Sequence, residues 1–241
     1  ELMHNLHRDL GLWYRKMCRR YLSNKRVLVL GCGSSGGIES LKQYASAIVG
    51  IDISPRRLKE ARSKFSEPNI IFVEGDAENL PFPNGTFDVV YCHAILHHLD
   101  LPKALMETRR VLVPKGYLYV AAEPGLLNPI AWLRRTFFPS HIHTPDEKPF
   151  IPHRFRKIVH LYGFREIDYQ PSFIFSPVVP VLGKKFSRVQ WKPLLNFLLS
   201  LDRFLLKTPC RELSWVIAGV YSLCPSTAKT HHSITGAQVL T

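Results

Sequence analysis

The first half of the chain alternates short apolar runs with amphipathic segments, a pattern that predicts buried strands separated by helices. The apolar runs cover residues 27–30, 47–51, 70–73, 87–92 and 117–122. The run at 27–30 is continuous, as is typical of a parallel strand covered on both faces. The intervening segments predict helices over 38–44, 55–65 and 102–111. This order predicts an α/β fold with a doubly wound, mostly parallel sheet.

The N-terminal residues predict an amphipathic helix over 2–21. Large apolar residues recur every three or four positions, at Leu2, Leu6, Leu10, Trp13, Met17 and Tyr21. We treat residues 1–24 as an N-terminal segment that packs on the following domain, with a lid or a membrane-surface helix as the alternative. The sequence begins with Glu1 rather than Met, which is compatible with a preceding segment.

Composition narrows the class of protein. The chain has 241 residues, enough for one α/β domain with insertions, and no apolar run approaches the ~20 residues that span a bilayer. Its five scattered cysteines include no C-x-x-C pair, which argues against a disulfide framework and favours a reducing cytoplasm. The formal net charge of +13 suits nucleic acid, an anionic membrane surface or an acidic substrate, and equally a generally basic soluble protein.

A glycine-rich turn follows the first predicted strand directly. Gly31, Gly33 and Gly36 stand where the chain must turn sharply and bring its backbone against a ligand. Asp52 ends the next strand, about twenty residues further on, where an acid can accept hydrogen bonds from both hydroxyls of a ribose. The turn satisfies the pattern G-x-G-x-x-G, so a nicotinamide or flavin dinucleotide is one of two ligand classes that fit. Residues further along the chain decide between them.

Polar residues also follow the third and fourth predicted strands. Asp76 lies just after the third strand, and His93 leaves the end of the fourth. Both positions belong to the edge at which open α/β sheets bind ligands. A carboxylate at the first position can accept a hydrogen bond from the exocyclic amine of an adenine.

Four segments together resemble the class I S-adenosylmethionine-dependent methyltransferases, in particular the broad group that acts on small molecules and lipid-like acceptors. They are VLVLGCGSSG, GIDIS, GDAENLPFPNGTFDVVYCHAILHHL and RRVLVPKGYLYV, and they cover about residues 25–123. One departure is minor: the turn before the fifth strand is Pro114-Lys115-Gly116 where the family has Pro-Gly-Gly. The resemblance makes a nicotinamide dinucleotide the lesser alternative.

The resemblance implies S-adenosyl-L-methionine as the cofactor and S-adenosyl-L-homocysteine as its product. The glycine turn would follow the methionine part, Asp52 would hold the ribose, Ile53 would pack on the adenine, and Asp76 would bind its amine. The expected cofactor-binding residues are Gly31, Cys32, Gly33, Gly36, Asp52, Ile53, Asp76, Ala77 and His93.

The resemblance also supplies a frame for the second half of the chain. It implies a Rossmann-like, doubly wound sheet of seven strands, mostly parallel with an antiparallel last strand. We expect a helix over 148–162 and the last two strands over 164–169 and 214–223. The methyltransferase domain then covers 25–224, and residues 225–241 are expected to be a disordered tail.

Two insertions, 124–147 and 171–212, interrupt this frame and are expected to form helical lids at the acceptor site. In the run 194–207, polar residues form a narrow stripe on a helix otherwise made of Leu and Phe. The stripe consists of Asn196, Ser200, Arg203 and Lys207. So wide an apolar surface either roofs the acceptor pocket or binds an anionic membrane through 184–207, where basic residues flank it. Either account indicates a hydrophobic acceptor.

Histidines are the candidate catalytic groups. Methyl transfer from a sulfonium mainly requires alignment of the reactants and exclusion of water, and a base of near-neutral pKa helps when the acceptor is a hydroxyl. His93 and His97 are candidates for this base or for positioning the acceptor, whereas His97 and His98 are adjacent and are not expected to face one pocket together. His141 and His143 lack a third ligand at a recognisable spacing, so no metal centre is expected.

The sequence thus predicts a methyltransferase that transfers a methyl group to a hydrophobic small molecule or lipid-like acceptor by in-line displacement. The alternatives are an RNA methyltransferase that uses the basic surface, an NAD-binding oxidoreductase and a non-catalytic cofactor-binding protein. Against RNA, the sequence lacks an appended RNA-binding module and reads Tyr91-Cys92-His93-Ala94 where base-amine methyltransferases carry Asn/Asp-Pro-Pro-aromatic. We expect a cytoplasmic protein, peripheral on the membrane if the apolar insertion binds lipid, with no obligate protein partner.

Overall fold

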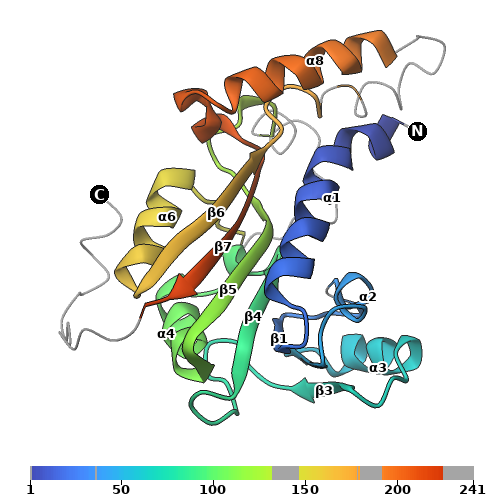
Figure 1. The fold of residues 1–241 in the computed structure, drawn as a ribbon, viewed down its shortest axis with the longest axis vertical. Helices are drawn as coiled ribbons and strands as arrows, with labels where there is room; N and C mark the ends of the chain where they lie inside the picture. Colours follow the sequence, from blue (N-terminus) through green and yellow to red (C-terminus); the bar gives the residue numbers. More distant parts are fainter. Residues whose placement is uncertain (1, 36, 132–146, 178, 180–191, 225–241) are drawn as a thin grey trace.

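A seven-stranded sheet forms the centre of the molecule (Figure 1). The computed structural model describes residues 2–35, 37–131, 147–177, 179 and 192–224, with side chains from residue 10 onward. The strands are β1 (Arg26–Leu30), β2 (Ala47–Asp52), β3 (Ile70–Glu74), β4 (Phe87–His93), β5 (Leu112–Pro124), β6 (Phe164–Ser172) and β7 (Val216–Leu223). Their order across the sheet is β3-β2-β1-β4-β5-β7-β6.

The direction of the strands confirms the expected doubly wound architecture. β1 pairs in parallel with β2 and β4, β2 with β3, and β4 with β5. β7 is antiparallel to both β5 and β6. Because the strand order reverses between β1 and β4, the carboxyl ends of these two strands form the position at which such sheets bind ligands.

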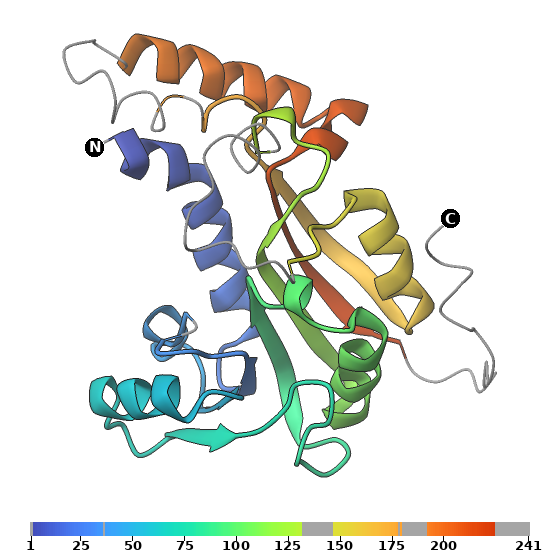
Figure 2. The same cartoon turned by 180° about the vertical axis from the view of Figure 1, so that it is seen from behind.

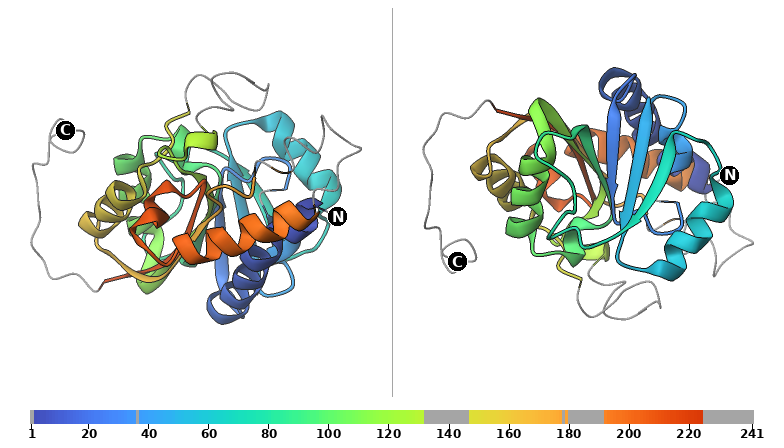
Figure 3. Two further views of the ribbon diagram at one scale, coloured as in Figure 1. Left: turned by 90° about the horizontal axis from the view of Figure 1, so that it is seen from above. Right: turned by 90° about the horizontal axis from the view of Figure 1, so that it is seen from below.

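Helices cover both faces of the sheet in three layers (Figure 3). They are α1 (Leu2–Tyr21), α2 (Ile38–Leu41), α3 (Pro55–Lys64), α4 (Leu101–Val111), α6 (Pro152–Leu161) and α8 (Lys192–Leu205), with short 3-10 helices η1 (Leu96–His98) and η2 (Pro209–Leu213). Side chains of α1, α2 and α3 pack on one face of the sheet, and those of α4 and α6 pack on the other. Successive residues of β1, such as Leu28 and Val29, are fully buried on opposite faces of the sheet. The run at 27–30 is therefore apolar throughout because both faces of the strand are covered.

Several boundaries differ from the expected ones for local reasons. α2 ends at Leu41 rather than at 44, because the following residues form a turn in which the Tyr44 carbonyl accepts a hydrogen bond from the Asn24 amide. β6 continues to Ser172 because it pairs with β7 as far as Val216. β5 runs from Leu112 to Pro124, beyond both ends of its apolar run.

α8 lies across the end of the molecule where β5 ends and where α1 begins (Figures 1 and 2). Its buried Leu195 packs with Phe173 and Val179, and Leu10 of α1 borders this cluster. The helix expected over 194–207 is thus present two residues earlier. Most of the first insertion, including His141 and His143, and residues 184–191 of the second lie outside the described residues, as do Gly36 and the tail 225–241.

The described residues also bear on membrane-spanning helices and on disulfides. Among them, no helix is both long and apolar enough to cross a bilayer. All five cysteines are free thiols, and Cys18, Cys32 and Cys92 are buried.

Candidate functional site

The glycine turn after β1 uses backbone conformations that other residues avoid. Gly31 has φ +56° and Gly33 has φ +51°, both in the left-handed region. A Cβ atom on Gly31 would lie 2.4 Å from the Ile95 side chain, so the turn also requires space that only glycine leaves. Gly37 ends the turn with φ +79° and precedes α2. The turn places left-handed glycine backbone at the carboxyl end of β1.

Asp52 at the end of β2 ties this turn to the neighbouring strand. The side chain is only 8% exposed, and its Oδ2 accepts a hydrogen bond from the Gly33 amide at 2.7 Å. Oδ1 accepts from the Ser54 amide at 2.9 Å. Each carboxylate oxygen can accept two hydrogen bonds, so both retain capacity for a further donor. Cys32, between the glycines, is fully buried and donates its amide to Ile51.

The other residues expected to contact an adenosine lie at the ends of β2 and β3. Ile53 follows Asp52 and is 73% exposed, a high value for a large apolar side chain. Asp76 is exposed, and its Oδ1 accepts from the Glu78 amide at 2.8 Å, while Ala77 is buried beside it. The structure therefore brings these residues to one edge of the sheet, and their contacts with a cofactor stay a prediction.

A buried carboxylate organises the loop after β4. Glu123, fully buried near the end of β5, accepts hydrogen bonds from the amides of Ile95, Leu96 and His97. His97 Nδ1 lies 2.8 Å from Glu123 Oε2. Because three amides already donate to the carboxylate, we assign the fourth hydrogen bond to Nδ1–H as donor. Glu123 thereby fixes η1 against the end of β5.

An irregularity in β5 aims Glu123 at this loop. The register of β5 with β7 shifts between Val120 and Glu123, and Ala122 between them has φ +59°. Ala94, which follows β4, has φ +50° and donates its amide to Ala121. Left-handed alanine is strained by about 1–2 kcal/mol relative to its ordinary conformation. Such strained bulges are concentrated at functional sites.

His97 and His98 take part in a further cluster. Their rings lie 4.1 Å apart, and together with Glu147 each offers a potential metal-ligating atom within 4.8 Å of the others. His97 already bonds Glu123 and is 6% exposed. The expectation that no metal centre is present therefore stays a prediction, and this cluster is a feature that the sequence spacing did not reveal.

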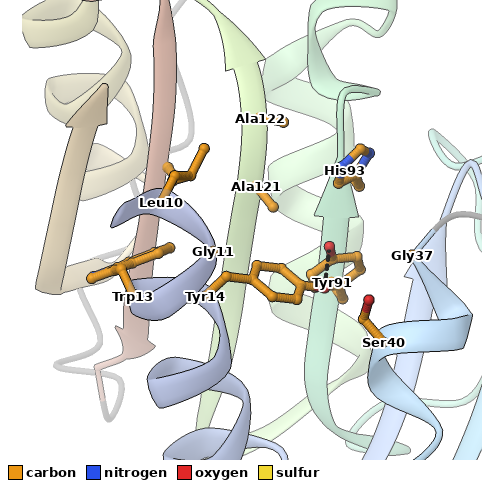
Figure 4. A pocket seen from close by; sticks show the side chains of 11 residues that line it. Leu10, Gly11, Trp13, Tyr14, Gly37, Ser40, Tyr91, His93, Ala121 and Ala122 are labelled. Atoms are coloured by element: carbon orange, nitrogen blue, oxygen red, sulfur yellow. Dashed lines mark hydrogen bonds between the residues drawn. The ribbon is translucent and has the colours of Figure 1, made fainter. Parts of the chain in front are cut away.

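A cavity of about 240 Å³ opens between α1 and the carboxyl ends of the central strands (Figure 4). It is lined by Leu10, Gly11, Trp13, Tyr14, Gly37, Ser40, Tyr91, His93, Ala121, Ala122 and Ala218. His93 belongs to this lining, whereas His97 does not. Gly37 belongs to both the lining and the glycine turn, so the cavity adjoins the expected cofactor loop.

Aromatic contacts fix α1 as one wall of this cavity. The Trp13 indole donates to Asp168 of β6 at 2.9 Å, and the Tyr14 and Tyr91 hydroxyls are 2.7 Å apart. Burial raises the pKa of both tyrosines well above its ordinary value, so both hydroxyls stay protonated. One hydroxyl donates to the other, and the accepting hydroxyl keeps a proton that it can donate elsewhere. α1 thus packs on the sheet and lines the cavity.

His93 is electrically neutral at neutral pH. Desolvation by the surrounding protein lowers its pKa below the ordinary 6.5, and the negative charge of Glu123 partly opposes this shift. The ring stacks near that of Tyr91, with centroids 6.4 Å apart, and its outer side remains exposed. A neutral imidazole at the cavity can accept a proton from a bound hydroxyl.

The sequence identified His93 and His97 as candidates, but not the residues that contact them, Tyr91 and Glu123. Glu123 stands in an apolar strand, where its burial and its four donors come from the bulge in β5. Tyr14 and Tyr91 read as ordinary core positions. The available signal for Glu123 was an acidic residue directly after the apolar run 117–122, because a charge buried there requires partners.

Comparisons with known proteins agree with this geometry. Residues 28–120 match the family model of the methyltransferase domain. An S-adenosylmethionine-dependent methyltransferase from Mesorhizobium loti has the same fold, with a TM-score of 0.61 at 16% identity over 87% of this chain and 95% of that chain.

Two curated relatives are more similar in sequence over shorter stretches. Phthiotriol/phenolphthiotriol dimycocerosates methyltransferase of Mycobacterium leprae is 37% identical over 46% of this chain and 43% of its own length. The methyltransferase YcgJ of Bacillus subtilis is 32% identical over 56% of each. The chain thus spans about half of these relatives. Together with the sheet order and the glycine turn, the matches show a methyltransferase domain of the class I S-adenosylmethionine-dependent type over residues 28–120.

Proposed function

We propose that the protein transfers a methyl group from S-adenosyl-L-methionine to a hydrophobic, lipid-like acceptor. The observation that carries the proposal is the cavity that joins the glycine turn, through Gly37, to His93 at the end of β4. A donor on the turn and an acceptor in the cavity would meet at this point. In-line displacement requires this proximity.

The residues at the edge of the sheet fit the cofactor. Asp52 has acceptor capacity for ribose hydroxyls, and Ile53 offers an exposed apolar side chain for an adenine face. Gly31 and Gly33 form the left-handed turn beside them. The nearest atom to a Cβ built on Gly33 would be in the Arg57 side chain, 3.8 Å away, so space for a ligand exists on that side. When bound, the cofactor supplies a methyl group already activated on a sulfonium.

The chain's own contribution is to align the acceptor and to accept its proton. For a hydroxyl acceptor, the unprotonated ring nitrogen of His93 would take the hydroxyl proton as the acceptor oxygen bonds to the methyl carbon. The carbon–sulfur bond would break in the same displacement, with S-adenosyl-L-homocysteine as the leaving group. The hydrogen-bonded pair of Tyr14 and Tyr91 can donate to a polar group of the acceptor inside the cavity. Glu123 and His97 position the loop that follows His93. The aromatic side chains of Trp13, Tyr14 and Tyr91 cover the cavity on the side of α1.

The acceptor class follows from the lining and from the relatives. Trp13, Tyr14 and Tyr91 make the cavity aromatic, which suits an apolar ligand with few polar groups. The mycobacterial relatives are named for lipid-like phthiotriol substrates. A lipid-like acceptor is the class that both observations support.

Transfer of a labelled methyl group tests the proposal directly. The purified protein is incubated with methyl-labelled S-adenosylmethionine and, separately, with a total lipid extract or total RNA. We expect label in the organic phase of the lipid reaction and none in RNA. The variant Asp52→Ala serves as the inactive control. Label in RNA with none in lipid would overturn the proposed acceptor class.

A further inference from the structure

The orientation of α8 is fixed by one buried carboxylate. Asp202 is 3% exposed and accepts hydrogen bonds from the amides of Phe175 and Ser176 at 2.9 and 3.1 Å. Leu195, two turns earlier on the same side, is fully buried against Phe173. These contacts define which side of the helix faces the protein.

A second apolar stripe lies on α8 beside this buried face. Leu194, Phe197, Leu201 and Phe204 are spaced three, four and three residues apart, the spacing of one helix face. Leu194 is 40% exposed, Phe197 is 63% exposed and Phe204 is 67% exposed. Single exposed apolar residues are common on proteins, but an aligned stripe that includes two exposed phenylalanines on one helix marks an interaction surface.

The charges around this stripe are of one sign. Lys192 and Arg203 are exposed on α8, and Lys207 follows it. The one acid of the helix, Asp202, is only 3% exposed and is bonded to the backbone amides of Phe175 and Ser176. An apolar stripe flanked by basic side chains is the arrangement of helices that lie in the surface of an anionic bilayer.

The position of α8 relates this surface to the cavity. α8 lies beyond the end of β5 and beside α1, whose residues Leu10 and Trp13 line the cavity (Figure 1). Leu126 and Leu127, which follow β5 at the same end of the molecule, are 41% and 39% exposed. A bilayer at this end would be next to the cavity and not at the far edge of the sheet.

We propose that α8 docks the protein on an anionic membrane surface through Leu194, Phe197, Leu201 and Phe204. The aromatic side chains enter the interface between headgroups and acyl chains, and the basic residues meet anionic headgroups. This inference deepens the proposed function by stating where a lipid-like acceptor is met. Its test measures binding and does not depend on methyl transfer.

Co-sedimentation with vesicles tests the docking surface. Wild-type protein is mixed with vesicles of phosphatidylcholine alone or with added phosphatidylglycerol, at low and high salt. We expect binding to the anionic vesicles that weakens with salt. The variant Phe197→Ser/Phe204→Ser should lose at least about fivefold in vesicle binding, because two exposed apolar side chains no longer enter the interface.

Matched variants separate docking from general surface effects. Met106→Ser/Leu161→Ser removes two apolar side chains of similar exposure, 53% and 51%, from α4 and α6, and should bind as wild type does. All variants are checked by thermal unfolding and by binding of S-adenosylhomocysteine, which should be unchanged. If the Phe197→Ser/Phe204→Ser variant does not show the expected loss of vesicle binding but all proteins bind S-adenosylhomocysteine, the docking inference is wrong and the proposed methyl transfer is unaffected.

Two results would overturn the inference. In the first, wild-type protein remains in the supernatant with anionic vesicles, or the Phe197→Ser/Phe204→Ser variant binds them equally well. In the second, light scattering shows a wild-type dimer that this variant converts to monomer, without vesicle binding by either. The stripe would then be covered by a second copy of the chain.

Discussion

The two ends of the central site are built in different ways. At the cofactor end, the turn after β1 is held by Asp52 of the next strand, nineteen positions away from Gly33. At the acceptor end, the wall includes Tyr14 of α1 and Tyr91 of β4, which are 77 positions apart. The loop that follows His93 is held by Glu123, which reaches back 28 positions to Ile95. Local chain geometry sets the first end, and packing between distant elements sets the second.

This difference explains how one fold serves many acceptors. The cofactor end needs glycines and an acid at fixed spacing, so substitutions there change the backbone itself. The acceptor end depends on side chains from separate elements, which can change one at a time without altering the turn. Variants at the acceptor end should therefore affect stability and turnover while leaving cofactor affinity intact.

The largest expected effect comes from removing the charge of Glu123. Glu123→Gln replaces one of the two accepting oxygens by an NH2 group, so two of the four hydrogen bonds from residues 95–97 lose their acceptor. We expect a loss of about 2–4 kcal/mol in the free energy of unfolding, measured by urea denaturation. Glu166→Gln, which removes a partly exposed ion pair with Arg156, is the control and should cost less than about 1 kcal/mol. Equal losses in both variants would contradict the assigned role of Glu123.

The next effect concerns His93. His93→Ala should reduce kcat for a hydroxyl acceptor by about a hundredfold. Its affinity for S-adenosylhomocysteine should change far less, because that product lacks the methyl group beside which His93 is expected to lie. His160→Ala, on the exposed surface of α6, should retain wild-type kcat. Unchanged turnover in His93→Ala would remove general base catalysis from the mechanism.

The pH dependence of kcat checks the same residue in the intact protein. Desolvation lowers the pKa of His93 below 6.5, so the ring is neutral and able to accept a proton at pH 7. Activity should fall only as the pH drops below 6.5, when the ring becomes protonated. The residual activity of His93→Ala should lack this acidic limb.

A smaller effect is expected for the tyrosine pair. Tyr14→Phe and Tyr91→Phe each remove one hydroxyl of the 2.7 Å hydrogen bond. The double variant should be less destabilised than the sum of the singles, with a coupling of about 1 kcal/mol in a double-mutant cycle by thermal unfolding. Strictly additive effects would show that α1 is held without this bond.

The smallest effect is a gain in stability at the β5 bulge. Ala122 has φ +59°, a conformation that glycine adopts without strain. Ala122→Gly should raise the free energy of unfolding by up to about 1 kcal/mol, after the entropy cost of glycine is subtracted. Ala121→Gly, at a neighbouring position without positive φ, should lower it. A loss in Ala122→Gly as large as in Ala121→Gly would contradict strain at the bulge.

The sequence predicts the features set by local chain geometry and misses those set by packing between distant elements. Apolar runs and the glycine turn predicted β1 to β4 and placed Asp52 and His93 at the strand ends, because strand periodicity and turn chemistry are local. The sequence predicted α8 as well, from its narrow polar stripe. Glu123 and the Tyr14–Tyr91 pair were missed, since a register shift and the docking of α1 bring those side chains into place, and neither has a local sequence pattern.

The most direct measurement is a calorimetric titration of S-adenosylhomocysteine and of NAD into the wild-type protein and Asp52→Ala. The account predicts that the wild type binds S-adenosylhomocysteine and not NAD. It also predicts that the substitution weakens binding at least about tenfold, or ~1.4 kcal/mol, through loss of the ribose acceptor. Binding of NAD in place of S-adenosylhomocysteine, or an unchanged affinity in Asp52→Ala, would contradict the assignment of the site.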